Sequence, residues 1–192
     1  MDLTKDFWNN RYKNKETRWD IGYASTPLKK YIDQLENKDI RILIPGCGNA
    51  YEAEYLHHRG FNNVFLLDIA SMALQQFSKR VPNFPKKNLI RENFFEHVGR
   101  YQLILEQTFF CAIDPKLRDK YVHKMHQLLI PKGKLVGLLF AQEFKNDHPP
   151  FGGTKEEYKK QFSTLFEIQK MELANNSIEA RKGTELFIQL IR

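Results

Sequence analysis

Two glycines follow a short apolar run early in the chain, in a pattern that allows close contact with a ligand. Residues 42–44 are Ile-Leu-Ile, Gly46 and Gly48 come next, and apolar Ala53 and Leu56 then recur at helical spacing. A continuous apolar run is typical of a parallel strand that is covered on both faces. Glycine lets the backbone turn sharply and approach a bound molecule closely. The segment therefore predicts a buried strand, a ligand-binding turn and a helix.

A carboxylate ends the next predicted strand. Residues 63–68 read Asn-Val-Phe-Leu-Leu-Asp, and Asp68 lies 20 residues beyond Gly48. At this spacing the second strand of a nucleotide-binding βαβ unit presents an acid to the two hydroxyls of a ribose. We therefore expect Gly46, Gly48 and Asp68 to hold a nucleoside cofactor.

The residue at position 51 bears on the kind of cofactor. Tyr51 stands where the Gly-x-Gly-x-x-Gly fingerprint of dinucleotide sites has its third glycine. That glycine lets the helix pack close to the strand beneath a pyrophosphate. The turn also contains no basic residue. A ligand with an adenosine ribose and no phosphates agrees with both observations, and S-adenosylmethionine is such a ligand.

Aromatic residues are concentrated ahead of the first predicted strand, at Trp8, Tyr12 and Trp19. We expect a helix over residues 4–12, followed by a loop. Two interpretations are open for these rings. They either pin an N-terminal arm, about residues 1–26, to the domain, or they cover a cationic ligand. The second interpretation suits a sulfonium ion, which is attracted to the faces of Trp and Tyr.

The composition is that of an ordinary globular domain. The chain has 192 residues, of which 42% are hydrophobic and 28% charged, and this is the size of one α/β domain. We expect one domain over residues 1–192, no membrane span, and a cytoplasmic location with Cys47 and Cys111 reduced. The net charge of +7 is spread over small groups of Lys and Arg. It favours a solvated surface, or attraction of anionic substrates, over nucleic acid.

Apolar periodicity and turn residues predict the remaining elements. Helices are expected over residues 27–35, 72–81 and 118–129, the last ended by Pro131-Lys132-Gly133, and strands over residues 88–90, 101–105, 134–140, 162–171 and 185–191. A short connection between the last two strands requires an antiparallel pair. The predicted fold class is α/β: a Rossmann-like sheet of about seven strands, five parallel followed by an antiparallel hairpin, with helices on both faces. This is the arrangement of class I methyltransferases.

Polar and aromatic side chains follow the predicted strands at one edge of this sheet. Asn93 and Phe94 come after the strand at residues 88–90, where an amide could bond the edge of an adenine and a ring could pack on it. A polar turn and a core phenylalanine are the alternative. Residues 142–157, which contain His148 and many turn formers, are predicted to form a substrate loop. His148 by itself does not indicate catalysis.

These segments together resemble the thiopurine S-methyltransferase family, which includes the plant and bacterial halide/thiol methyltransferases. The resemblance covers nearly the whole chain. Its most specific part is Thr-Phe-Phe-Cys-Ala-Ile-Asp-Pro at residues 108–115, followed by Arg118. The other matching segments are residues 7–8, 17–22, 45–48, 68 and 181–185.

The resemblance implies an S-adenosylmethionine site made by Trp8, Tyr12, Trp19, Gly46, Asp68, Asn93, Phe94 and Gln107. Three of these depart from the family pattern. Tyr12 replaces a usual tryptophan, Asn93 stands where relatives often have aspartate, and Gln107 stands where plant members have tyrosine. Each replacement retains a group capable of a similar contact.

The predicted function is methyl transfer from S-adenosylmethionine to a small nucleophile such as a thiol, thiopurine, thiocyanate or halide, with S-adenosylhomocysteine as the product. In-line displacement from a sulfonium needs alignment rather than a nucleophile on the protein, so we assign no catalytic residue and no metal ligand. The candidate substrate residues are Phe109, Phe151 and Arg181, although Arg181 could instead pair with Glu185. An RNA methyltransferase and a non-catalytic S-adenosylmethionine-binding module are the alternatives. A monomer is expected.

Overall fold

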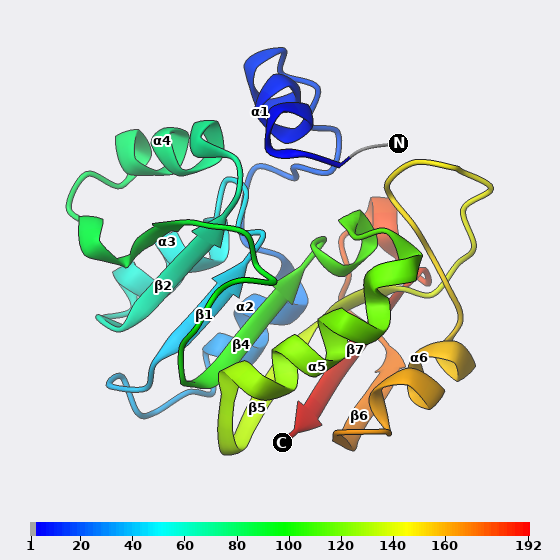
Figure 1. The fold of residues 1–192 in the computed structure, drawn as a ribbon. Coiled ribbons are helices and arrows are strands. Elements are labelled where there is room, and N and C mark those ends of the chain that lie inside the picture. The colour runs from blue at the N-terminus through cyan, green and yellow to red at the C-terminus, as the bar shows by residue number, and fades with distance from the viewer. Residues whose placement is uncertain (1–2) are drawn as a thin grey trace.

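A seven-stranded mixed sheet forms the centre of the computed structural model, which describes residues 3–192 (Figure 1). The strands are β1 (Ile42–Pro45), β2 (Val64–Asp68), β3 (Leu89–Arg91), β4 (Tyr101–Gln107), β5 (Leu129–Phe140), β6 (Glu167–Leu173) and β7 (Glu185–Ile191). Their order across the sheet is β3-β2-β1-β4-β5-β7-β6. The first five pair in parallel, and β7 pairs antiparallel with β5 and β6. The predicted parallel sheet with a terminal antiparallel hairpin is confirmed.

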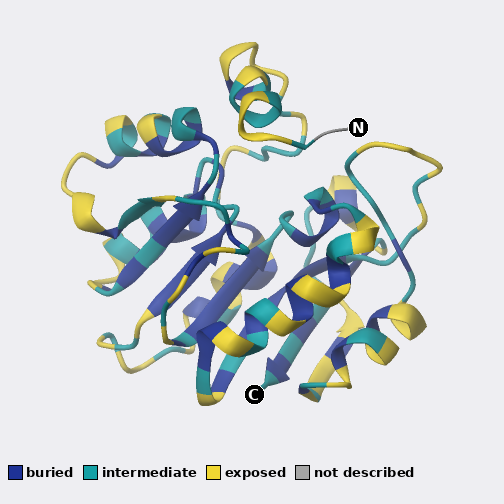
Figure 2. Cartoon of the chain, in the orientation of Figure 1, coloured by how far each residue is buried: buried dark blue, intermediate teal, exposed yellow. Residues whose placement is uncertain are grey.

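Helices cover both faces of the sheet. α2 (Thr26–Ile32), α3 (Tyr51–His58) and α4 (Ser71–Arg80) lie on one face, and α5 (Arg118–Leu128) and α6 (Lys155–Phe162) lie on the other. Successive side chains of a strand point to opposite faces. Ile42 and Ile44 therefore pack on the side of α2, α3 and α4, while Leu43 packs on the side of α5 and α6. Figure 2 shows the central strands mostly buried, with exposed positions concentrated on the outer sides of the helices and in the loops.

One helix stands apart from both layers. α1 (Lys5–Lys13) lies over the carboxyl ends of the parallel strands (Figure 1). The hydroxyl of Thr4 caps it by accepting the Phe7 N–H at 3.3 Å. Met1 and Asp2, the start of the predicted N-terminal cover, lie outside the described residues. The arrangement puts α1 at the sheet edge where ligands bind in open α/β folds.

The strand predicted over residues 162–171 is wrong at its start. Phe162 ends α6, and β6 begins only at Glu167. A capping box opens α6: the Thr154 hydroxyl accepts the Glu157 N–H at 3.2 Å, and the Glu157 carboxylate accepts the Thr154 N–H at 2.8 Å. Phe162 packs into the core beneath this helix, and this burial accounts for an apolar residue at that position. The helix also shortens the predicted substrate loop, since residues 155–157 belong to α6.

The fifth strand is longer than predicted. β5 starts at Leu129, and Pro131, Lys132 and Gly133, expected to stop the preceding helix, lie within it. Lys132 has a φ of 63°, and the pairing of β4 with β5 shifts register near this end. These residues therefore deform the strand instead of separating it from α5. No helix within residues 3–192 has both the length and the apolar character needed to cross a bilayer.

Candidate active site

The floor of the site is the turn between β1 and α3. Three alternate residues of this turn have left-handed backbone, with φ of 55° at Gly46, 53° at Gly48 and 53° at Ala50. Glycine tolerates this region and alanine is strained in it. The turn therefore brings backbone N–H groups to the carboxyl edge of the sheet, and neither Gly46 nor Gly48 adds a side chain of its own there.

Asp68 ties this turn to the end of β2. Its Oδ2 accepts the Gly48 N–H at 2.9 Å, and its Oδ1 accepts the Ala70 N–H at 2.8 Å. Burial raises the pKa of the carboxyl to about 6, and these backbone donors oppose the rise. Each carboxylate oxygen has a further lone pair, so Asp68 can hold the turn and still accept hydrogen bonds from a ligand.

The aromatic rings near the N-terminus lie directly over the turn. A Cβ atom built on Gly48 would lie 2.7 Å from the Tyr12 hydroxyl oxygen. Trp19 packs edge-on against both Trp8 and Tyr12, with ring centroids 5.8 and 6.0 Å apart. Burial, with the negative charge of Asp68, raises the pKa of the Tyr12 phenol far above its ordinary value, so the phenol stays neutral and polar at the turn.

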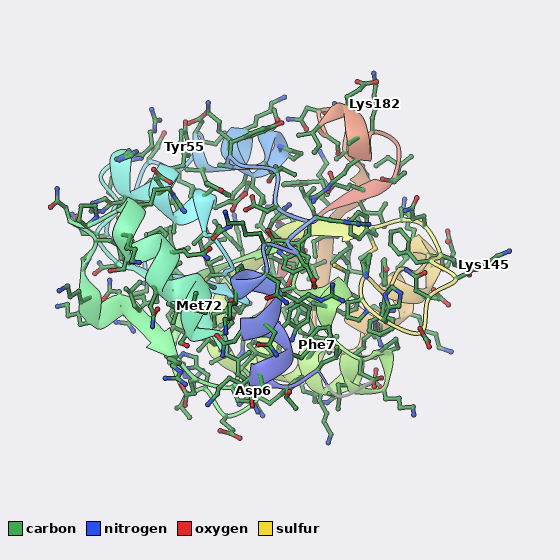
Figure 3. The ribbon with its side chains drawn as sticks, turned by 90° about the horizontal axis from the view of Figure 1, so that it is seen from above. Asp6, Phe7, Tyr55, Met72, Lys145 and Lys182 are labelled. Carbon is green, nitrogen blue, oxygen red and sulfur yellow. The ribbon has the colours of Figure 1, made fainter. Side chains whose placement is uncertain are left out.

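The arm that carries these rings is anchored through polar side chains. Asn9 accepts the Met72 N–H at 3.1 Å and the Ser71 hydroxyl at 3.3 Å, at the start of α4. Figure 3 looks onto this edge: α1, with Phe7, crosses the middle of the view, and Met72 lies beside it. Asp20 accepts hydrogen bonds from the Asn49 amide and, at 3.4 Å, from the Tyr51 hydroxyl. Both interpretations of the aromatic arm therefore agree with its geometry: it is pinned to the domain and it also covers the turn.

The end of β4 forms the opposite wall. Thr108 has a φ of 56°, and the turn it makes directs Phe109 over the floor, because a Cβ on Gly46 would lie 2.1 Å from the Phe109 ring. Phe94 packs edge-on against Phe109, with centroids 5.1 Å apart. The buried Oε1 of Gln107 has no hydrogen-bond partner among the described residues. This wall thus combines aromatic surface with one unpaired amide oxygen.

Glu106 holds the Thr108 turn from below, and sequence reasoning assigned it no role. It is fully buried, and its Oε1 accepts the N–H groups of Phe109 and Phe110, each at 2.8 Å. Its Oε2 accepts the hydroxyl of Tyr121. Burial raises the pKa of the carboxyl to about 7, against the effect of these three donors. The available sequence signal was a carboxylate inside an otherwise apolar strand.

Asn93 lies on the β3 side of the site. Its Oδ1 accepts the Phe95 N–H at 3.1 Å, which makes a local turn. Its amide nitrogen faces Glu96 at 3.4 Å. Asn93 and Phe94 thus form the polar turn and the core phenylalanine of the alternative interpretation, and both also border the cavity described next.

A cavity of about 1180 Å³ joins these parts. It runs from the glycine turn beneath α1 to the loop after β5. The predicted site residues that line it are Trp8, Tyr12, Trp19, Gly46, Asp68, Asn93, Phe94, Gln107, Phe109 and Arg181. Phe151 does not line it, whereas Pro149 and Pro150 do. The backbone of Phe151 is instead used structurally, since its N–H donates to the Cys111 carbonyl at 2.7 Å.

Arg181 is almost completely enclosed at the C-terminal side of the cavity. Its Nη1 lies 3.3 Å from Glu185 Oε1, and the side chains of the two residues are 10% and 4% exposed. Its Nη2 donates to the Trp19 carbonyl at 2.7 Å. The ion pair considered from the sequence is therefore present, and the guanidinium also holds the N-terminal arm.

The other half of the cavity is lined by the segments after β4 and β5, which contribute apolar residues beside the polar Asp114, Gln142 and His148. Ile113, Leu117, Phe140 and Phe144 line it, together with the thiol-bearing Cys111. Burial raises the pKa of that thiol to about 12, so it remains protonated at neutral pH. This half can seat a small apolar or polarisable group beside the Thr108 turn.

Comparison with known proteins identifies relatives whose sequences match almost the entire chain. The family model described as thiopurine S-methyltransferase matches residues 3–189. The probable thiol methyltransferase 2 of Arabidopsis thaliana is 29% identical over 184 residues, which cover 93% of this chain and 81% of that protein. The thiopurine S-methyltransferase of Bos taurus is 24% identical over 207 residues, covering 94% and 84%.

Solved structures share the fold at low sequence identity. A Burkholderia thailandensis 1,6-didemethyltoxoflavin-N1-methyltransferase, determined with bound 1,6-didemethyltoxoflavin and S-adenosylhomocysteine, has a TM-score of 0.81 at 14% identity and covers 99% of this chain and 87% of its own. The magnesium protoporphyrin IX methyltransferase of Synechocystis, with bound S-adenosylmethionine, has a TM-score of 0.72 at 12% identity, covering 100% and 98%. The class I methyltransferase fold is confirmed.

Proposed function

The chain belongs to the thiopurine S-methyltransferase family, and from this premise we propose that it methylates a small polarisable nucleophile: a thiol, thiopurine, thiocyanate or halide. It is an S-adenosylmethionine-dependent methyltransferase. One continuous cavity joins the Gly46 turn to a second half beside Phe109, where apolar residues such as Ile113 and Phe140 are part of the lining, and this continuity supports the acceptor proposal. Cofactor and acceptor would meet there, at the end of β4.

The residues of the cofactor half fit S-adenosylmethionine. Asp68 retains free lone pairs for ribose hydroxyls at the end of β2. Gln107 lines the same cavity, and its Oε1, unpaired among the described residues, would be available to a polar group of the cofactor. Trp8, Tyr12 and Trp19 line this cavity as well, and their aromatic faces would attract a sulfonium. The bound cofactor supplies an electrophilic methyl group, and these side chains orient it and exclude water.

The acceptor half suits a nucleophile that needs little activation. Among the described residues that line it, the Cys111 thiol is held protonated by burial, and Asp114 uses a carboxylate oxygen to accept the Lys116 N–H at 2.9 Å. His148 is exposed, with its Nδ1 2.9 Å from the Pro149 carbonyl. A thiolate is already reactive near neutral pH and a halide has no proton to lose. Alignment of acceptor, methyl and sulfur is then the main catalytic contribution, worth up to about 7–11 kcal/mol.

A methyl-acceptor screen tests this proposal. The purified protein is incubated with S-adenosylmethionine and, in parallel, a thiol, a thiopurine, thiocyanate and iodide, with mass spectrometric detection of the products. We expect turnover of at least one of them, and thiol rates that rise with pH through the thiol's own pKa while iodide rates stay comparatively flat. Tight S-adenosylhomocysteine binding without turnover of any of the four would refute the acceptor class.

We also propose the context in which the enzyme works. It acts as a single domain and a monomer, with residues 3–26 as the N-terminal cover and residues 142–154 as the acceptor loop. Cys47 and Cys111 are both unpaired, which supports a reducing, cytoplasmic location. The dispersed basic residues give no support for a nucleic acid partner.

A further inference from the structure

The acceptor loop, residues 142–154, is closed at its base by backbone hydrogen bonds. The Gly153 N–H donates to the Gln142 carbonyl at 3.0 Å, and this joins the two ends of the loop. The Phe151 N–H donates to the Cys111 carbonyl at 2.7 Å, which joins the loop to the segment after β4. The middle of the loop, residues 145–148, is exposed. Its position over the cavity therefore depends on how the base is held.

The base is packed too closely for side chains at its glycines. A Cβ atom on Gly152 would lie 1.7 Å from the Gln142 carbonyl oxygen, and one on Gly153 would lie 2.7 Å from the Tyr158 hydroxyl. The Tyr158 hydroxyl also donates to the Phe140 carbonyl at 2.9 Å. The returning end of the loop therefore packs tightly against both the end of β5 and α6.

Arg118, the first residue of α5, lies against this point. It is 8% exposed, and its Nη2 donates to the carbonyls of Phe151 at 3.2 Å and Gly152 at 2.9 Å. Its guanidinium carbon lies 4.6 Å from the centroid of the Phe110 ring and 5.8 Å from that of Tyr158. The guanidinium is therefore enclosed by two aromatic faces and two loop carbonyls.

No carboxylate of residues 3–192 lies within ion-pair distance of Arg118, and its Nε has no partner among them. A buried cation without a counter-ion is costly. An ion pair therefore does not account for this residue, whereas its two carbonyl contacts do, because a planar guanidinium can hold two oxygens in a fixed arrangement.

We propose that Arg118 is a positioning residue for the acceptor, which acts by fixing the base of the acceptor loop so that Phe144 and Pro149 wall the cavity. Arg118 does not itself line the cavity. It also packs on Phe110, whose N–H is held by Glu106, and so links the loop to the turn that carries Phe109. The inference rests on the proposed function only in the identity of the small-molecule acceptor.

Four variants separate positioning from general stability. Arg118→Met keeps the length and apolar stem and removes the donors, while Arg118→Lys keeps a charge and a donor. Gly152→Ala displaces the same base with Arg118 intact, because its Cβ would overlap the Gln142 carbonyl. Arg59→Met is the matched control, since the Arg59 side chain is 45% exposed and, among the described residues, forms an ion pair only with Asp33, at 3.6 Å.

Initial rates with thiocyanate and with a thiol give the first readout, and calorimetric S-adenosylhomocysteine affinity gives the second. For Arg118→Met and Gly152→Ala we expect acceptor kcat/KM to fall tenfold or more, mainly through KM, with the cofactor affinity within twofold of the parent protein. Arg118→Lys should recover part of the loss, and Arg59→Met should change neither quantity. An Arg118→Met protein with unchanged acceptor KM, or with an equal loss of cofactor affinity, overturns the proposal.

Limited proteolysis tests the loop without any acceptor. Lys145 lies at the outer rim of the loop (Figure 3) and is exposed, so trypsin cleavage after it reports how firmly the base is held. Cleavage at Lys145 should be at least fivefold faster in Arg118→Met and Gly152→Ala than in the parent and in Arg59→Met. Equal cleavage rates overturn the proposal.

If the parent binds S-adenosylhomocysteine but methylates no tested acceptor, the proposed acceptor class fails and the cleavage rates still decide the role of Arg118. If Arg118→Met does not fold, Gly152→Ala and Arg118→Lys decide it.

Discussion

Replacing Glu106 by glutamine should change the pH dependence of stability by an amount set by the burial of its carboxyl. Glutamine has the same shape, and its Oε1 can still accept the Phe109 and Phe110 N–H groups, now each 2.8 Å from the Glu106 oxygen. Its amide nitrogen would face Tyr121, whose hydroxyl can accept instead of donate. The substitution therefore removes the ionisation while it preserves the packing.

The magnitude follows from the raised pKa. Burial moves the pKa of Glu106 from an ordinary 4.5 to about 7, so the folded state binds the proton more tightly than the unfolded state. The resulting stabilisation is fully present below pH 4.5 and is lost as pH rises through about 7. The free energy of unfolding of the parent, minus that of Glu106→Gln, should therefore fall by roughly 2–3 kcal/mol between about pH 5 and 8. Other titrating groups largely cancel in this difference.

Urea unfolding of both proteins at four values of pH measures the difference directly. Tyr121→Phe supplies a matched variant, because it removes a donor that favours the charged carboxylate. In that background the pKa of Glu106 should be higher still, so the fall should begin at the same pH and extend to higher pH. A difference that stays constant between pH 5 and 8 would refute the reasoning, since it would mean that Glu106 does not titrate in this window.

Three further outcomes are expected. Asp68→Ala should weaken S-adenosylhomocysteine binding by about 1.5–3 kcal/mol in calorimetry; unchanged affinity in a folded protein would exclude it from the cofactor site. Replacing Trp8 or Trp19 by Leu should reduce affinity for cationic S-adenosylmethionine more than for its neutral product, by about 0.5–2 kcal/mol, and equal losses would indicate packing alone. Gly46→Ala should lose at least about 1–2 kcal/mol of unfolding free energy, because its φ of 55° is unfavourable for alanine and its Cβ would overlap the Phe109 ring. Adding Phe109→Ala should then cost less than it does alone, and additive losses would contradict the overlap.

The parallel half of the fold could be predicted because its signals are local. The apolar run at residues 42–44, the two glycines after it and the distance to Asp68 each specify one step of a βαβ unit. In the structure β1 is buried along its whole length and pairs in parallel with β2. Asp68 accepts the Gly48 N–H across those 20 residues, while its contact with a ribose stays a prediction.

The region after β5 was harder to predict because its local signals compete. A loop is the structure that Gly152, Gly153 and the preceding prolines favour. The capping pair of Thr154 and Glu157, which starts α6, follows them directly and gives a weaker signal. The apolar character of Phe162 then favours a strand at that position. Only the packing of α6 against α5 distinguishes a buried helix residue from a strand residue at that position.

Contacts between distant segments were beyond prediction for a different reason. The Arg181 guanidinium donates to the carbonyl of Trp19, 162 residues away. A main-chain oxygen is present at every residue, so no residue type marks it as a partner. The same holds for the carbonyls bound by Arg118. The N–H groups bound by Glu106 are near in sequence, but no residue type marks them as partners either.

Those same contacts explain how one sheet edge can support the shape of the proposed acceptor site. Irregular segments leave N–H and C=O groups that no strand or helix satisfies. Here Glu106, Arg118 and Arg181 satisfy three sets of them and in doing so fix the Thr108 turn, the acceptor loop and the N-terminal arm. The cavity wall then contains two kinds of residue. A residue such as Phe144 contributes only surface, so replacing it should change which acceptor fits, whereas replacing an anchor should move the wall itself.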